Sequence, residues 1–435
     1  MPTLAALASD LAAGRATSVE LVDACLERIA DPDGEGARAF VAVDADGARA
    51  TARAMDALRA AGSEPSPLAG IPVSIKDLFD VRGQVTRAGS RVLDGPPAAA
   101  DAPAVARWRR AGLVFVGRTN MTEFAYSGLG LNPHYGTPAN PWDRAARRIP
   151  GGSTSGGAVS VSDAMAHAAL GSDTGGSCRI PAALCGLVGW KPTQVPALLE
   201  GVAPLSSSLD TVGVIGRSVA CCATLDERAL APLALAPRLA VVRNYLFDDV
   251  EPAVASAFAR AIDVLRDAGA QVTDITVPEL DTLAEMNAGG GFPAAEAYAW
   301  HHDLLAARGG EYDPRVSVRI RRGEALTARD LIVLRERRAA FIAGVSERLA
   351  PFDAFLSPTV PLVAPPIAAL DDDAEYARVN VLMLRNPTVV NLLDGCAASV
   401  PMHRPGEPPT GLMVAGLHGA DERVLRVAAW IEEQL

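Results

Sequence analysis

The spacing of apolar and polar residues predicts helices in the first sixty positions of the chain. Apolar side chains recur at helical intervals over residues 19–29. Thr17, followed three positions later by Glu20, forms the capping-box pattern that begins a helix. A second helix, rich in Ala and Arg, is predicted over residues 46–61 and ends at Gly62.

From residue 71 onward, short runs of β-branched residues replace the helical pattern. The segments IPVSIKD and LVFVGRTN end in polar turns, which is typical of buried strands with functional side chains at their ends. A helix is predicted between them over residues 102–111, and strand–helix–strand patterns recur over residues 238–278. A further strand is predicted in FDAFLSPTV, and residues 280–350 are predicted to be mostly helical.

This alternation favours an α/β fold with a mixed, mostly parallel central sheet covered by helices on both faces. The 435 residues contain no internal repeat and no low-complexity linker, so we expect one large domain. Residues 1–63 supply N-terminal helices, and residues 64–225 hold the candidate chemistry. Residues 226–435 form the second half of the sheet, with a variable substrate-pocket region at about 280–350.

Composition and charge argue against two classes of partner, nucleic acids and membranes. A net charge of −11 argues against nucleic-acid binding, which normally requires a basic face. No run reaches the ~18 apolar residues of a membrane span, and no basic leader precedes the first helix. The six cysteines show no C-x-x-C spacing and are expected to be buried thiols in a reducing compartment. We therefore expect a cytoplasmic monomer or homodimer without membrane or nucleic-acid partners.

The familiar catalytic motifs are absent from the sequence. There is no P-loop, no G-x-G-x-x-G after a strand and no H-E-x-x-H, and the histidines lack metal-binding spacing. No metal or cofactor is therefore expected. Neither Ser153 nor Ser177 lies in a G-x-S-x-G elbow, so a nucleophilic serine would need a base other than histidine. Lysine is the remaining common base, provided that burial lowers its pKa.

Lys76 meets that requirement in the sequence. It follows the apolar run Ile71–Ile75, so the stem of its side chain is expected to lie in the core. A lysine that simply terminates a strand in solvent is the alternative interpretation. The Gly175–Ser177 turn could direct backbone N–H groups into one small space, as an oxyanion hole requires. An ordinary tight turn is the alternative there.

The order of these segments resembles the amidase signature family. The segments are Lys76, then Gly151-Gly152-Ser153, then Asp173-Thr174-Gly175-Gly176-Ser177 with Arg179 close behind. Ser153 and Ser177 are 24 positions apart (177 − 153), the separation of the two catalytic serines in that family. The segments KDLFDVRGQVTRAGS, GRTNMTEFAYSG, CGLVGWKPT and SLDTVGVIGRS also resemble family segments in family order, so the resemblance covers nearly the whole chain.

The resemblance implies a role for each matching residue. Ser177 would be the nucleophile, and Ser153, in a cis peptide bond with Gly152, would bridge it to the neutral base Lys76. The oxyanion hole would be formed by the N–H groups of Thr174, Gly175, Gly176 and Ser177. Asp173 and Arg179 would brace this loop. The segment VSVSDAMAHAALG between the serines would be mostly a buried helix.

One departure from the family pattern leaves an alternative open. The first cluster reads GGSTSGG where many members have GGSSGGS, which makes Ser155 a rival for the bridging role, although spacing favours Ser153.

The implied activity is hydrolysis of a carboxamide, anilide or carbamate through an acyl-enzyme, with some ester cleavage and without a cofactor. The glutaminase subunit of a tRNA-dependent amidotransferase is the alternative within the family. A catalytically inactive binding or scaffold member is the alternative of another class. Tyr126, Leu129, Phe292 and Leu384 are candidate pocket residues, and no acid-binding arginine stands out in the sequence. The expected substrate is a small, fairly apolar amide or carbamate.

Overall fold

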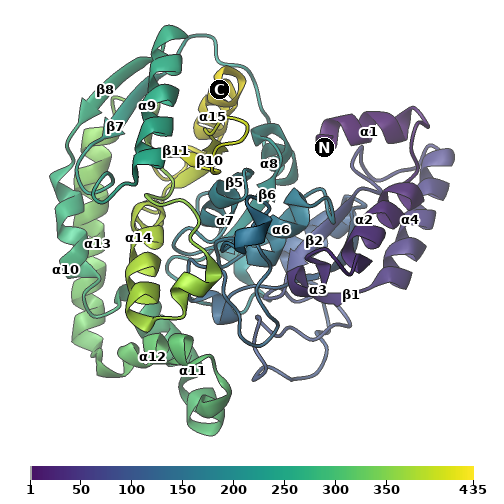
Figure 1. The fold of residues 1–435 in the computed structure, drawn as a ribbon, viewed down its shortest axis with the longest axis horizontal. Helices are drawn as coiled ribbons and strands as arrows, with labels where there is room; N and C mark the ends of the chain where they lie inside the picture. Colours follow the sequence, from purple (N-terminus) through teal and green to yellow (C-terminus); the bar gives the residue numbers. More distant parts are fainter. Residues whose placement is uncertain (1) are drawn as a thin grey trace.

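An 11-stranded sheet runs through the protein, with helices on both of its faces (Figure 1). The computed structural model describes residues 2–435. The strand order is β1-β3-β2-β4-β6-β5-β10-β11-β9-β7-β8. The strands are β1 (Phe40–Val43), β2 (Pro72–Lys76), β3 (Val114–Thr119), β4 (Ala169–Asp173), β5 (Val188–Lys191), β6 (Thr211–Gly216), β7 (Arg238–Val242), β8 (Gln271–Ile275), β9 (Ala354–Pro358), β10 (Cys396–Pro401) and β11 (Gly411–Gly416).

Fifteen α-helices lie among residues 2–435. They are α1 (Leu4–Ala12), α2 (Ser18–Ala30), α3 (Gly36–Ala39), α4 (Ala45–Ala60), α5 (Pro103–Arg110), α6 (Ser155–Ser162), α7 (Arg179–Leu184), α8 (Val219–Leu225), α9 (Pro252–Asp267), α10 (Leu283–Met286), α11 (Gly291–Arg308), α12 (Pro314–Arg321), α13 (Ala328–Leu349), α14 (Asp373–Leu392) and α15 (Asp421–Gln434). The expected single α/β domain with a mixed sheet is confirmed.

One detail of the expected sheet is wrong: within the described chain, four neighbouring pairs are parallel and six are antiparallel. The parallel pairs join β2 to β3 and β4, and β7 to β8 and β9. The antiparallel pairs form the middle of the sheet, from β4 through β6, β5, β10 and β11 to β9, and its β1 edge. β10 runs into β11 through nine loop residues, 402–410, and antiparallel strands need no crossover helix.

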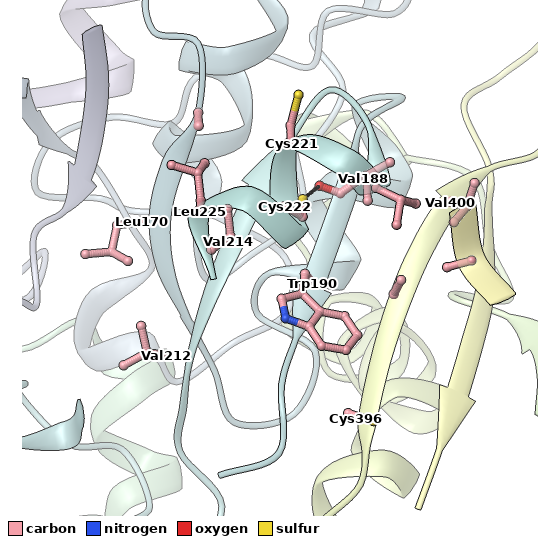
Figure 2. Close-up of a cluster of buried hydrophobic side chains, with 14 of the residues drawn as sticks. Leu170, Val188, Trp190, Val212, Val214, Cys221, Cys222, Leu225, Cys396 and Val400 are labelled. Carbon is pink, nitrogen blue, oxygen red and sulfur yellow. Dashed lines mark hydrogen bonds between the residues drawn. The ribbon is translucent and has the colours of Figure 1, made fainter. Parts of the chain in front are cut away.

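Side chains of the central strands alternate between two apolar layers. Leu170 of β4 packs into the layer that holds α1, α5, α8, α9 and α15, whereas Ala169 packs against α2, α4, α6 and α7. Figure 2 shows part of the first layer, with Trp190 among strand residues and the Cys222 thiol bonded to the carbonyl of Val188 at 3.6 Å. All six cysteines are buried and unpaired, as the sequence predicts. The central strands are therefore buried on both faces of the sheet.

The two predicted N-terminal helices are confirmed as α2 and α4, but the strand β1 between them was predicted as helix. One prediction near the site is also wrong. Thr17 and Glu20 form a complete capping box at the start of α2. The segment VSVSDAMAHAALG is not mostly helical, because α6 ends at Ser162 and Ala164 adopts a left-handed φ of 58°. The chain then enters β4, where pairing with β2 and β6 outweighs the helical preference of alanine.

No helix within residues 2–435 combines the length and the apolar character that crossing a bilayer demands.

Candidate active site

Lys76 is the last residue of β2, inside the sheet between β3 and β4. Its side chain is 0% exposed, which excludes the solvent-facing alternative. The Nζ group donates to the Ser153 hydroxyl at 2.8 Å and to the Ser172 hydroxyl at 2.9 Å. Burial lowers the pKa of Lys76 from 10.5 to about 8, although the nearby Cys178 and Asp173 favour its charged form. The amine can therefore lose its proton in mildly alkaline solution.

Ser172 is a partner of Lys76 that the sequence analysis missed. It lies on β4, next to β2, so the strand register brings its hydroxyl to the lysine. In the sequence, the feature that could have pointed to Ser172 is a polar residue within the mostly apolar run AALGSD. Because that run was predicted to end a helix, its pairing with β2 could not be anticipated.

Ser153 and Ser155, both in the first Gly-Ser segment (residues 151–157), differ in their hydrogen bonds. The Gly152–Ser153 peptide bond is cis, and the Ser153 carbonyl accepts a hydrogen bond from Thr122 N–H at 3.1 Å. Ser155 begins α6, and its buried hydroxyl has no hydrogen-bond partner within residues 2–435. The lysine amine is thus bonded to the hydroxyl of Ser153 and not to that of Ser155.

Ser177 lies on the wall of a cavity, two residues before α7. The N–H of Thr154 donates to the Ser177 carbonyl at 3.2 Å, which ties the two Gly-Ser segments together. The Ser177 hydroxyl makes no hydrogen bond to any group in the described chain, Ser153 included, and the residue is 2% exposed. No intramolecular acceptor therefore competes for this hydroxyl, which belongs to a residue that lines the cavity.

The turn before Ser177 exposes backbone to the same cavity. Thr174, Gly175 and Ser177 line the cavity, and within residues 2–435 the N–H groups of Gly175 and Ser177 have no acceptor. Gly176 differs, because its N–H donates to the Asp173 carboxylate at 2.9 Å. Gly176 has a φ of 120°, and a Cβ there would lie 2.5 Å from Pro387, so only glycine fits.

A buried ion pair braces this turn. The Arg179 guanidinium bonds to the Asp173 carboxylate at 2.8 Å, and neither side chain is exposed. Burial alone would raise the pKa of Asp173, but the Arg179 charge and hydrogen bonds hold this pKa well below its usual range. Asn391 of α14, which the sequence analysis missed, bonds to both side chains. A polar residue in the apolar run VVNLL was the available signal.

We predict that Arg179→Met lowers the free energy of unfolding by ~3–5 kcal/mol, because it leaves the Asp173 carboxylate buried without its cation. Urea denaturation measures this loss. The double variant Asp173→Asn/Arg179→Met removes both charges and should lose clearly less stability than Arg179→Met alone. Equal losses in the single and double variants would contradict the ion-pair account.

The cavity has a volume of about 110 Å³, comparable to the ~150 Å³ cavity that holds benzene in an engineered protein. Its wall is mostly apolar and is formed by Ala125, Tyr126, Ser127, Thr174, Gly175, Ser177, Leu205, Leu209, Asn287, Gly290, Pro293, Arg319, Asn380, Leu384 and Thr388. Two of the four predicted pocket residues, Tyr126 and Leu384, are among them. Leu129 and Phe292 are not: Leu129 packs with residues of α7 and α14, and Phe292 lies in the core formed with α10 and α13.

Arg319 of α12 is the only charged side chain on the cavity wall within the described chain. Its Nη1 donates to the Tyr126 carbonyl at 2.6 Å, and its guanidinium carbon lies 5.0 Å from the centre of the Tyr376 ring. These contacts hold the cation in place. The sequence analysis missed it, because nothing in RVSVRIRRGEA separates this arginine from its neighbours.

No three His, Cys, Asp or Glu side chains gather in a metal-binding arrangement in the part of the chain that the structure describes.

Comparisons with known proteins extend over nearly the whole chain. The profile of the Amidase family matches residues 20–233 and 229–425. The chain is 36% identical to a 2-amino-5-chloromuconic acid deaminase of Comamonas testosteroni, over 99% of this chain and 95% of that protein. It is 35% identical to a glutamyl-tRNA(Gln) amidotransferase subunit of Roseiflexus sp. (strain RS-1), over 98% and 94%. The crystal structure of an amidase superposes with a TM-score of 0.91 at 32% identity, over 100% of both chains.

Proposed function

The chain belongs to the Amidase family of hydrolases, which act on C–N bonds, and from this premise we propose that it cleaves a small amide through Ser177, Ser153 and Lys76. The observation that carries the proposal is the buried Lys76 amine bonded to Ser153, whose neighbour Thr154 is bonded through its N–H to the carbonyl of Ser177, a residue of the cavity wall. A base, a bridging hydroxyl and a nucleophile are the parts that serine-based acyl transfer requires.

In the proposed acylation step, the Ser177 oxygen forms a bond to the amide carbonyl carbon. Its proton passes to Ser153 while the Ser153 proton passes to the neutral Lys76 amine. The tetrahedral oxyanion accepts hydrogen bonds from the N–H groups of Thr174, Gly175 and Ser177, three residues that line the cavity. Each such donor contributes ~3–4 kcal/mol of transition-state stabilisation. Gly176 N–H, already bonded to Asp173, holds the turn in shape.

The leaving group departs when the relay runs in reverse. Lys76 returns the proton through Ser153 to the amide nitrogen, the C–N bond breaks, and an acyl ester remains on Ser177. Water then attacks this ester and gives its proton to the same relay. The carboxylic acid leaves, and Ser177 regains its proton. Asp173 and Arg179 support these steps by fixing the turn, and Gly152 gives the Ser153 segment room to pass Gly130, since a Cβ on Gly152 would lie 2.5 Å from the Gly130 nitrogen.

For the substrate, we propose a small amide that carries a carboxylate. Arg319 supports this, because a single cation in an apolar wall favours an anionic ligand and repels a cationic one. The name of the Comamonas relative, a deaminase of an amino-substituted muconic acid, supports it as well. This differs from the fairly apolar amide or carbamate expected from the sequence, because the cavity contains Arg319.

A panel of small amides, anilides, aryl carbamates and esters, each with and without a carboxylate, tests the proposal. Ammonia or amine release from the carboxylate-bearing amides at a higher kcat/KM than from their neutral counterparts is expected. A preference for the neutral members would contradict the assigned substrate class. The absence of turnover, together with no covalent labelling of Ser177 by a fluorophosphonate, would indicate an inactive binding protein instead.

The pKa of Lys76 predicts the pH dependence of the reaction. The neutral amine is the base, so protonation at low pH removes it. With this pKa lowered to about 8, kcat/KM should rise about tenfold per pH unit in mildly acidic solution and level off above about pH 8. Initial rates across this range measure the profile. A flat profile would contradict the base assignment.

A second candidate function is a glutaminase subunit that passes ammonia to a partner. The 35% identity to the Roseiflexus protein favours it. Glutamine hydrolysis by the purified chain, measured with and without the other subunits of such a complex, separates the two functions. Stimulation by the partner subunits is expected only of the glutaminase.

A further inference from the structure

A second polar group lies on the cavity wall with Arg319. Asn380 belongs to α14 and is only 5% exposed. Its Oδ1 accepts hydrogen bonds from the Ser127 hydroxyl at 2.8 Å and from the Gly128 N–H at 3.0 Å. Its Nδ2 donates to no acceptor within the described residues. The oxygen of this amide therefore accepts two hydrogen bonds from the protein, whereas the nitrogen donates none.

The Gly128 contact fixes which way the amide points. A backbone N–H can only donate, so the atom of Asn380 that faces Gly128 must be the oxygen. The Ser127 hydroxyl is itself held in place, since it accepts from Tyr376 at 3.1 Å and from the Leu129 N–H at 3.2 Å. The Nδ2 group consequently remains as a preset donor on a residue that lines the cavity.

The same tyrosine links this amide to the cavity cation. The Tyr376 hydroxyl bonds to Ser127, while its ring lies under the Arg319 guanidinium at 5.0 Å. Tyr376 thus connects Arg319 with Ser127 and Asn380, and these three polar residues lie on a mostly apolar cavity wall. A cation and an amide N–H without an internal acceptor, on the wall of one cavity, match a ligand with two acceptor oxygens.

We propose that Asn380 is a specificity-determining residue whose Nδ2 donates to one oxygen of a substrate carboxylate while Arg319 binds the other. The inference rests on the proposed amidase function and deepens it. Binding of a carboxylate to a neutral, rigid donor beside a cation selects for geometry as well as charge, because the donor does not need to be reoriented.

Asn380→Asp is the sharpest variant, because aspartate keeps the acceptor for Ser127 and Gly128, removes the Nδ2 donor and adds one negative charge. Asn287→Asp is the matched control, since it introduces the same charge elsewhere on the cavity wall. The experiment measures the rate at which a fluorophosphonate labels Ser177 in the presence of increasing succinamate, which carries a carboxylate, or butyramide, which does not.

In the wild type, succinamate should slow labelling at a concentration at least tenfold lower than butyramide does. Asn380→Asp should abolish that tenfold preference, while Asn287→Asp retains most of it. Equal loss of the preference in both variants, or its persistence in Asn380→Asp, would overturn the role of Asn380. Failure of Ser177 to be labelled in the wild type would instead contradict the proposed amidase function, so the two failures are distinguishable.

Discussion

Replacing Ser177 with alanine is expected to lower kcat by ~10⁴-fold or more, because no other group can form the acyl-enzyme. The hydroxyl makes no hydrogen bond to the rest of the described chain, so its removal should leave the fold and the melting temperature almost unchanged. Steady-state amide hydrolysis and thermal unfolding of the purified variant measure the two effects. Turnover near the wild-type rate would rule out Ser177 as the nucleophile.

Ser155→Ala is the matched control for this experiment. Ser155 is a buried serine of the same two Gly-Ser segments, and its hydroxyl has no partner among residues 2–435. Its removal should change kcat/KM by less than a few-fold. A loss as large as that of Ser177→Ala would revive the alternative in which Ser155, rather than Ser153, carries the proton.

Replacing Lys76 with methionine has the second-largest expected effect. Methionine retains the apolar stem inside the sheet but cannot accept a proton, and loss of a general base costs ~10²–10⁴-fold in kcat. The residual activity should also lose its rise with pH, since the group that titrates at about pH 8 is gone. Amide hydrolysis across the pH range measures both effects in one variant.

The chain contains a second lysine, which makes a demanding control. Lys191 is also fully buried, and burial likewise lowers its pKa to about 8, but its amine bonds to the carbonyls of Pro192 and Gly395 instead of a serine. In Lys191→Met, stability should fall while the pH dependence of kcat/KM stays. If Lys191→Met flattened the profile and Lys76→Met did not, the base would have been misassigned.

The residues of the proposed triad could be predicted from the sequence because each lies in a short local pattern. Lys76 ends an apolar run, and the two serines lie in glycine-rich segments 24 positions apart. These local patterns could not predict which side chains contact one another in the fold. Ser172 reaches Lys76 only through the pairing of β2 with β4, across 96 positions of sequence.

The proposed specificity residue Arg319 could not be predicted from the sequence for a different reason. Arg319 is one of many arginines in a helical region, and its place on the cavity wall depends on how α12 packs against the loop at Tyr126. Phe292 and Leu129 were predicted for the pocket because they lie in the regions expected to set specificity, and both lie in the core instead. The antiparallel centre of the sheet was missed because segments such as GLVGWK, buried on both faces, show no alternation from which pairing could be inferred.

Direct titration of the Lys76 amine tests the central claim, a buried and readily deprotonated base. Lys76 and Lys191 are the only lysines in the sequence, so protein labelled with ¹³C-lysine gives two side-chain signals, which Lys191→Met assigns. The account predicts that the Lys76 signal titrates with a midpoint of about 8. A midpoint at the ordinary value of 10.5 or above would show that the amine stays charged at the pH of catalysis, and would contradict it.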